Sequence, residues 1–168
     1  MGKDLMTNSN STSEDFPPKH VICVGAVVTK GDQILLVRQA LGHALEGQWS
    51  IPWGFVDKSE FPDAAACRET LEESNIEAQI IGLLGIQELH NQGWIAVVFL
   101  CSYTKGSPLA DGGVETDRAR FFSLDEITHF EEPIEPWCKW IVRKVLEGNH
   151  NIIPIEPQNP YIPLKSYL

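Results

Sequence analysis

A short stretch of the chain, residues 54–76, concentrates acidic side chains at a spacing that could hold a metal ion. Its second half has the features of a helix, because Pro62 suits a first helical position and good helix formers follow it. At about 100° per residue, one arc of about 100° contains three carboxylates: Glu69, Glu72 and Glu73. Carboxylates within about one turn, roughly 5.4 Å of axis, repel one another. A Mg²⁺ ion, which prefers oxygen ligands, would relieve that repulsion.

The same spacing predicts a small apolar face on the other side of this helix. Three side chains fall within roughly 60° of one another: Ala64, Cys67 and Leu71. We expect this face to pack on the core. The alternative interpretation is a solvated acidic face, which accounts for the glutamates but requires neither the glycine at position 54 nor the further acid Glu60.

This stretch resembles the Nudix box, whose pattern is G-x5-E-x7-R-E-U-x-E-E-x-G-U, where U is aliphatic. The matching positions are Gly54, Glu60, Arg68, Glu69, Glu72, Glu73 and Ile76. Two positions depart from the pattern. Thr70 occupies a usually aliphatic site, and Asn75 replaces the glycine after the helix. Asn is the next best residue for a left-handed helix C-cap, so the geometry should be preserved.

The resemblance implies an α/β fold of the Nudix type, an α/β/α sandwich with a mixed, partly antiparallel sheet between helices. It also implies that Glu69 and Glu73 are the main ligands of Mg²⁺, for which Mn²⁺ can substitute. Glu72 would assist them directly or through water, and Gly54 would offer its backbone carbonyl to the metal.

Other site residues follow from the same resemblance. Arg68 is expected to pair with Glu60 and to orient the ligand carboxylates; the alternatives are a direct substrate contact for Arg68 and direct metal ligation by Glu60. The general base stays open between a box glutamate and an acid from a later loop. Glu115, after Gly112 and Gly113, stands where that later acid would be and is also a candidate metal ligand. Asp117 is the runner-up.

Substrate contacts are harder to place. Trp53 stands where the family usually has a glycine, and it could cover the adenine or ribose of a substrate or act as a core plug. Arg38, Arg118 and His90 are candidate phosphate contacts.

The resemblance implies an enzyme that hydrolyses the pyrophosphate bond of a nucleoside diphosphate linked to another moiety. ADP-ribose or a dinucleotide is the first expectation for the substrate, and a (d)NTP is the second. The alternative is a non-catalytic Nudix-like nucleotide-sensing or regulatory module. A third class, a prenyl-diphosphate isomerase, would need Cys67 or Cys101 to act, and neither lies in a supporting motif.

Composition limits the partners. The formal charge of −10 over 168 residues argues against nucleic acids and anionic membranes as partners. Four cysteines are scattered without zinc-binding spacing: Cys23, Cys67, Cys101 and Cys138. Scattered thiols, no apolar run of transmembrane length and a polar N-terminus predict reduced cysteines and a cytoplasmic protein.

The remaining sequence supplies the elements that would position the box. Apolar runs predict strands at 21–28, 33–38, 94–103 and 121–122, with extended segments at 77–85 and 86–90. A short helix is predicted to begin at 124–127, and an amphipathic helix at 137–147 with Trp137, Ile141 and Val145 or Leu146 on its apolar face. We expect a disordered tail at 1–18, one Nudix domain at 19–148, and a Pro-rich tail at 149–168 packed on that domain or on a homodimer partner.

Overall fold

The computed structural model of the protein describes residues 20–89, 93–155, 157 and 167. The strands are β1 (Val21–Lys30), β2 (Gln33–Gln39), β3 (Trp49–Ser50), β4 (Trp53–Phe55), β5 (Ile76–Glu88), β6 (Trp94–Gly106), β7 (Thr116–Ser123) and β8 (Ile153–Pro154). The helices are α1 (Pro62–Ser74), α2 (Leu124–His129) and α3 (Pro136–Leu146). The strands form one sheet in the order β3-β2-β1-β6-β5-β8, with β4 paired to β1 and β7 paired to β2.

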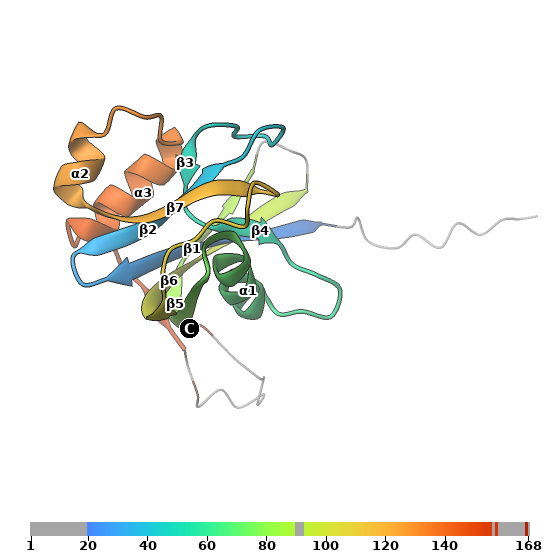
Figure 1. Cartoon of the computed structure of the whole chain (residues 1–168). Coiled ribbons are helices and arrows are strands. Elements are labelled where there is room, and N and C mark those ends of the chain that lie inside the picture. The colour runs from blue at the N-terminus through green and yellow to red at the C-terminus, as the bar shows by residue number, and fades with distance from the viewer. Residues whose placement is uncertain (1–19, 90–92, 156, 158–166, 168) are drawn as a thin grey trace, which may run out of the picture.

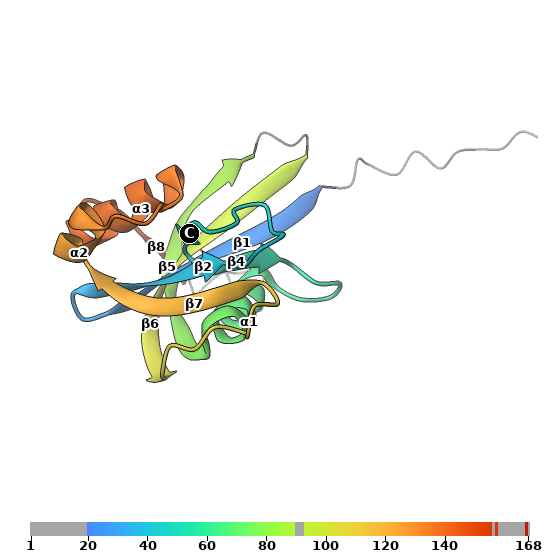
Figure 2. The ribbon, with the colours of Figure 1, turned by 45° about the horizontal axis from the view of Figure 1, so that its top comes forward.

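The sheet lies between helices, as Figures 1 and 2 show: α2 and α3 cover one face and α1 covers the other. Strand β1 runs parallel to β6 and antiparallel to β2 and β4. The expected α/β/α sandwich with a mixed sheet is therefore confirmed. Helix α1, which carries the acidic residues of the box, lies on the face of the sheet opposite α2 and α3.

Strand β1 divides the core because its alternate side chains point to opposite faces. Val27 packs with Ile127 and Val142 beneath α2 and α3. Its neighbours Ala26 and Val28 belong to a second cluster with α1 and Phe99. Burial on both faces explains why this strand is apolar along nearly its whole length.

Helix α1 begins and ends as its sequence predicts. Pro62 is at the first turn, and Asn75 closes the helix in the left-handed region at φ 56°, with its N–H donating to the carbonyl of Leu71. The predicted packing face is wrong, however. Ala64 and Leu71 are exposed, whereas Ala65, Ala66, Glu69, Thr70 and Glu73 are buried. The helix thus turns its acidic side, and not its apolar side, toward the sheet.

Thr70 shows how the departure from the box pattern is accommodated. Its side chain is fully buried, and its hydroxyl donates to the carbonyl of Ala66 at 2.7 Å. Because that bond lies within the helix, the hydroxyl is satisfied without a partner from the sheet.

Two further predictions needed correction. The segments expected at 77–85 and 86–90 form one strand, β5, whose register shifts between Ile80 and Gly82 and between Leu83 and Gly85. In α3 the buried side chains are Cys138, Val142 and Val145, which join the core cluster of Val27 and Ile127. The side chains of Trp137, Ile141 and Leu146 are only partly buried and pack at the margin of that cluster.

The C-terminal segment meets the body at two described points. Ile153 and Pro154 pair with Leu83 and Gly82 of β5. The ring of Tyr167 lies 5.5 Å from that of Phe99. The predicted N-terminal tail lies outside the described residues, as does His90.

All four cysteines are free, and Cys23, Cys101 and Cys138 are buried. Within the described ranges, each helix is too short or too polar to cross a lipid bilayer.

Candidate active site

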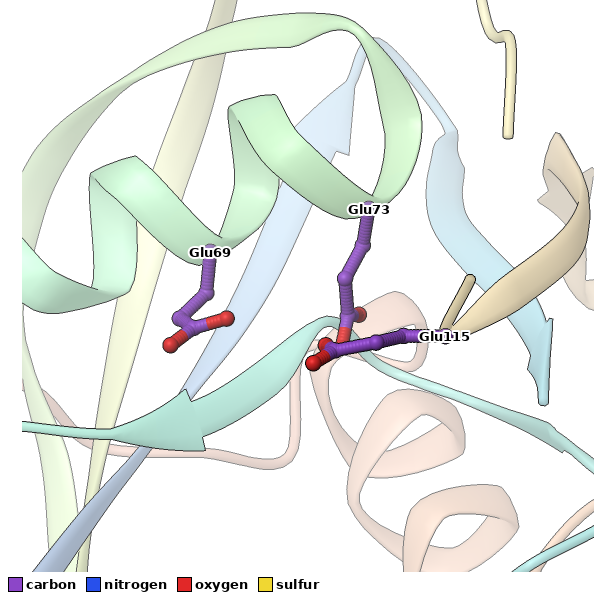
Figure 3. A group of neighbouring side chains, drawn as sticks. All are labelled: Glu69, Glu73 and Glu115. Carbon is purple, nitrogen blue, oxygen red and sulfur yellow. The ribbon is translucent and has the colours of Figure 1, made fainter. Parts of the chain in front are cut away.

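Helix α1 carries two glutamates on the face it turns toward the sheet. Glu69 and Glu73 are one turn apart, and they are only 7% and 2% exposed. Figure 3 shows both side chains projecting from the same side of the helix. Small Ala65 and Ala66 on this face let the helix approach β1 closely. Close packing of the helix therefore buries the two carboxylates.

Gly54 of β4 lies directly against Glu69. A Cβ atom built on Gly54 would stand 2.1 Å from the Glu69 Cδ and Oε1 atoms and 2.5 Å from Oε2. A real Cβ contact is essentially never this short, so the side-chain-free position provides the space that the carboxylate occupies. This explains physically why the box needs a glycine here.

Glu115 reaches the same place from the start of β7 (Figure 3). One carboxylate oxygen from each of Glu69, Glu73 and Glu115 lies within 4.8 Å of the other two. Glu115 is exposed, whereas its two partners are buried. The Thr116 hydroxyl donates to the Glu73 carbonyl at 2.8 Å, which ties β7 to the end of α1. These three residues are called the acidic triad below.

The electrostatics of the triad are unfavourable without a cation. Burial, reinforced by the nearby charge of Glu69, raises the pKa of Glu73 well above its ordinary value; the backbone N–H of Trp53 opposes this by donating to Glu73 Oε2 at 3.3 Å. Burial also raises the pKa of Glu69, and Arg68 partly counteracts that rise. Oxygen-only donors, a close cluster and space created by Gly54 together fit a hard divalent cation such as Mg²⁺.

Arg68 pairs with Glu60 as expected. Its Nε and Nη2 donate to the two Glu60 oxygens at 3.0 and 2.9 Å, and Nη2 also donates to the carbonyl of Phe55. Nη1 donates to Glu69 at 2.8 Å and to Glu72 at 2.9 Å. The guanidinium therefore fixes the Glu69 carboxylate relative to the loop before the helix.

Glu72 is the box glutamate that the structure does not bring into the triad. Its side chain is 58% exposed, and its carboxylate bonds to Arg68. At about 100° per residue, Glu72 lies roughly 60° from Glu69 on the side away from Glu73, and only roughly 40° from Arg68, so its side chain falls at the edge of the buried face beside the guanidinium.

Three other sequence candidates lie in a separate ion-pair network. Arg38 forms a bidentate pair with Asp117 at 2.6 and 2.7 Å and also reaches Glu132. Arg118 pairs with Glu132 at 3.0 Å. None of these residues lines the cavity at the triad. The structure thus does not bring Arg38, Arg118 or Asp117 to the acidic triad.

The triad opens into a cavity of about 270 Å³, which the described residues Gln39, His43, Trp53, Gly54, Phe55, Asp57, Glu69, Glu73 and Glu115 line. Gln39, His43 and Asp57 were not anticipated from the sequence, because no local pattern marks them. His43 is held by a bond of 2.6 Å between its Nε2 and the carbonyl of Val114.

Trp53 also lines a second cavity of about 210 Å³, on the α3 side of the sheet. Apolar side chains dominate this cavity, among them Ile51, Val98 and Trp137. Gln87 and Ser50 are among its few polar residues. Trp53 therefore lines both the acidic cavity and the apolar one.

Known proteins resemble this chain in sequence and in fold. The family model for the NUDIX domain matches residues 19–142. A MutT-like protein from Streptomyces ambofaciens is 33% identical over 74% of this chain and 74% of its own length. An ADP-ribose pyrophosphatase from Methanocaldococcus jannaschii is 25% identical over 71% of this chain and 73% of its own. Among solved structures, a NUDIX hydrolase from Nitrosomonas europaea superposes with a TM-score of 0.67 at 23% identity, covering 77% of this chain and 72% of that one. Because the family model spans most of the chain and the box residues Gly54, Glu69 and Glu73 line one acidic cavity, the protein belongs to the NUDIX family of hydrolases.

Proposed function

We propose that the protein is a Mg²⁺-dependent hydrolase of the pyrophosphate bond in a nucleoside diphosphate linked to a second moiety. Water adds across one P–O–P bond, so that the products are two phosphate monoesters. The acidic triad is the observation that carries this proposal. Two buried carboxylates and one exposed carboxylate converge, and among the described cationic side chains only that of Arg68 bonds to any of them.

The side chains have distinct roles in this proposal. Glu69 and Glu73 offer oxygens from one helical face, and Glu115 offers a third from across the cavity. When bound, Mg²⁺ supplies positive charge to the phosphate oxygens and lowers the pKa of water. Glu115, as the exposed member, has the access to solvent that a general base requires, although a box glutamate is the other candidate for that role.

Arg68 is proposed to hold the carboxylate of Glu69 in place. Glu60 and Glu72 bond to the same guanidinium, and we assign both to fixing its orientation rather than to direct contact with the cation. Ligands oriented by neighbouring hydrogen bonds hold a metal more tightly than free ones do.

The two cavities favour a substrate with one charged and one largely apolar part. Arg68 is engaged with Glu60, Glu69 and Glu72, and the described residues that line the cavity include no lysine or arginine, so positive charge for the phosphates must come from the cation. A diphosphate carries less charge than a triphosphate and suits such a site better. The apolar cavity beyond Trp53 provides walls for a nucleoside or sugar. The relative named ADP-ribose pyrophosphatase supports ADP-ribose as the first substrate, with a dinucleotide next and a (d)NTP after these.

The test compares the wild type with Glu73→Gln, using ADP-ribose, NADH, diadenosine polyphosphates, nucleotide sugars and dNTPs with and without Mg²⁺. We expect wild-type turnover that requires Mg²⁺ and a near-complete loss in the variant. Glu88→Gln is the matched control, because Glu88 is an exposed glutamate of β5 outside both cavities. Equal turnover by wild type and Glu73→Gln would refute the role of the triad. Nucleotide binding without hydrolysis of any of these compounds would support a sensing module instead.

A further inference from the structure

The loop before β7 is closed around one carboxylate that lies outside the triad. Asp111 Oδ1 accepts from the backbone N–H groups of Gly113, Val114 and Thr116 at 3.1, 3.0 and 3.1 Å. Asp111 Oδ2 accepts from the N–H of Glu115 at 2.8 Å. Positive φ values of 86° and 91° at Gly112 and Gly113 permit this tight path.

The backbone of Glu115 is consequently held from two directions. Its N–H donates to Asp111, and its carbonyl accepts from the N–H of Ala40, after β2, at 2.8 Å. The next residue, Thr116, is fixed to the end of α1 because its hydroxyl donates to the carbonyl of Glu73. An exposed glutamate at the tip of a loop would ordinarily sample many positions, but this one starts from a fixed Cα atom.

We propose that Asp111 is a positioning residue, which sets the backbone of Glu115 so that its carboxylate reaches the cation site formed with Glu69 and Glu73. This inference rests on the proposed function, because it requires Glu115 to act on the bound cation. Asp111 itself does not belong to the triad and does not line the cavity around it. The four hydrogen bonds that its carboxylate accepts all come from backbone N–H groups of the loop.

The Asp111→Asn substitution isolates the decisive bond. An amide oxygen in place of Oδ1 keeps the three bonds to Gly113, Val114 and Thr116. The amide nitrogen in place of Oδ2 is a donor, so it faces the Glu115 N–H and cannot accept from it. The loop therefore stays closed while one of the two bonds that hold the Glu115 backbone is lost. Asp111→Ala, which removes all four bonds, is the more severe variant.

Charge is the competing explanation, since the negative Asp111 also acts on Glu73. A double-mutant cycle with Glu115→Gln separates the two effects. Loss of charge weakens cation binding in either background. Loss of positioning weakens it only where Glu115 retains its carboxylate.

The experiment titrates the full chain with Mn²⁺ alone, by calorimetry or electron paramagnetic resonance, in the wild type, Asp111→Asn, Glu115→Gln and the double variant. We expect Asp111→Asn to weaken Mn²⁺ binding about 10-fold in the wild-type background, the usual range for a residue that orients a metal ligand. In the Glu115→Gln background its effect should be below about twofold. Asp125→Asn is the control for loss of an exposed aspartate, because Asp125 lies on α2 and not at the triad cavity.

Four results would contradict the proposal, and each points to a different error. If Glu115→Gln weakens Mn²⁺ binding but Asp111→Asn does not, the positioning role fails while the function stands. If Asp111→Asn weakens binding equally in both backgrounds, Asp111 acts through its charge and the inference is overturned. If the wild type binds no Mn²⁺, or Glu115→Gln leaves binding unchanged, the assigned cation site or the role of Glu115 fails first. Melting temperatures in EDTA show that each variant is folded.

Discussion

Replacing Gly54 by alanine is the smallest change that should disable the site. The added methyl would lie 2.1 Å from the Glu69 carboxylate, whereas an ordinary contact begins at 3.4 Å. The carboxylate must therefore retreat by about 1 Å. Misplacement of a site by that distance can cost about 10²-fold in rate, or about 2.7 kcal/mol of transition-state stabilisation.

The assay measures AMP release from ADP-ribose over a range of Mg²⁺ concentrations. We expect Gly54→Ala to lower kcat about 100-fold and to raise the Mg²⁺ concentration needed for half-maximal rate, because the displaced oxygen is a proposed metal ligand. The melting temperature in EDTA should change little, since Glu69 is a flexible side chain that can move without disturbing β4.

Gly85→Ala is the matched control. Gly85 is also a strand glycine, and a Cβ built on it meets no atom within 4 Å. Its kcat and Mg²⁺ dependence should equal those of the wild type. If Gly54→Ala also matched the wild type in both quantities, then the Glu69 carboxylate would not need the space beside Gly54, and the proposed geometry of the cation site would be wrong.

Other predictions concern charge and backbone geometry. Arg68→Lys should weaken Mn²⁺ binding about 10-fold, because one ammonium cannot replace the fork that joins Glu60, Glu69 and Glu72; calorimetry checks this. Without metal, Glu73→Gln should raise the melting temperature at pH 8. The pKa of Glu73 is higher in the folded chain than in the unfolded chain, so at any pH above the unfolded pKa its ionisation destabilises the fold, and glutamine removes that cost. That advantage should vanish as the pH falls below about 4.3, where the unfolded chain also protonates this residue; a pH series of thermal melts in EDTA that shows no such trend would contradict it. Asn75→Ala should lower the free energy of unfolding by about 1 kcal/mol, because alanine tolerates φ 56° poorly, whereas Asn75→Gly should cost less; urea denaturation distinguishes the two.

The sequence predicted those parts of the site that depend on local spacing. Glu69 and Glu73 are one helical turn apart, so any helix over the box brings them together. The left-handed cap at Asn75 is likewise a property of a few consecutive residues. The sheet followed from apolar runs of strand length, although the shifts of register within β5 leave no comparable mark in the sequence.

Predictions that depended on distant partners were less successful. Arg38 and Arg118 were candidate phosphate contacts, but Arg38 bonds to Asp117 and Glu132, 79 and 94 residues away, and Arg118 also bonds to Glu132. No sequence pattern shows that these acids would satisfy the two guanidinium groups first. The face of α1 was mispredicted for a related reason. Periodicity assigns burial to apolar residues, whereas here the buried side of the helix carries the acids.

The bond between the Thr116 hydroxyl and the Glu73 carbonyl joins positions 43 residues apart in the chain. Two members of the triad therefore come into place as soon as α1 forms, whereas the third arrives only when β7 has docked beside β2. Such non-local pairing is a slow step in assembly. A nascent or partly denatured chain would thus hold a cation weakly, with two carboxylates, and tight capture of the ion would signal that the last strand is in place.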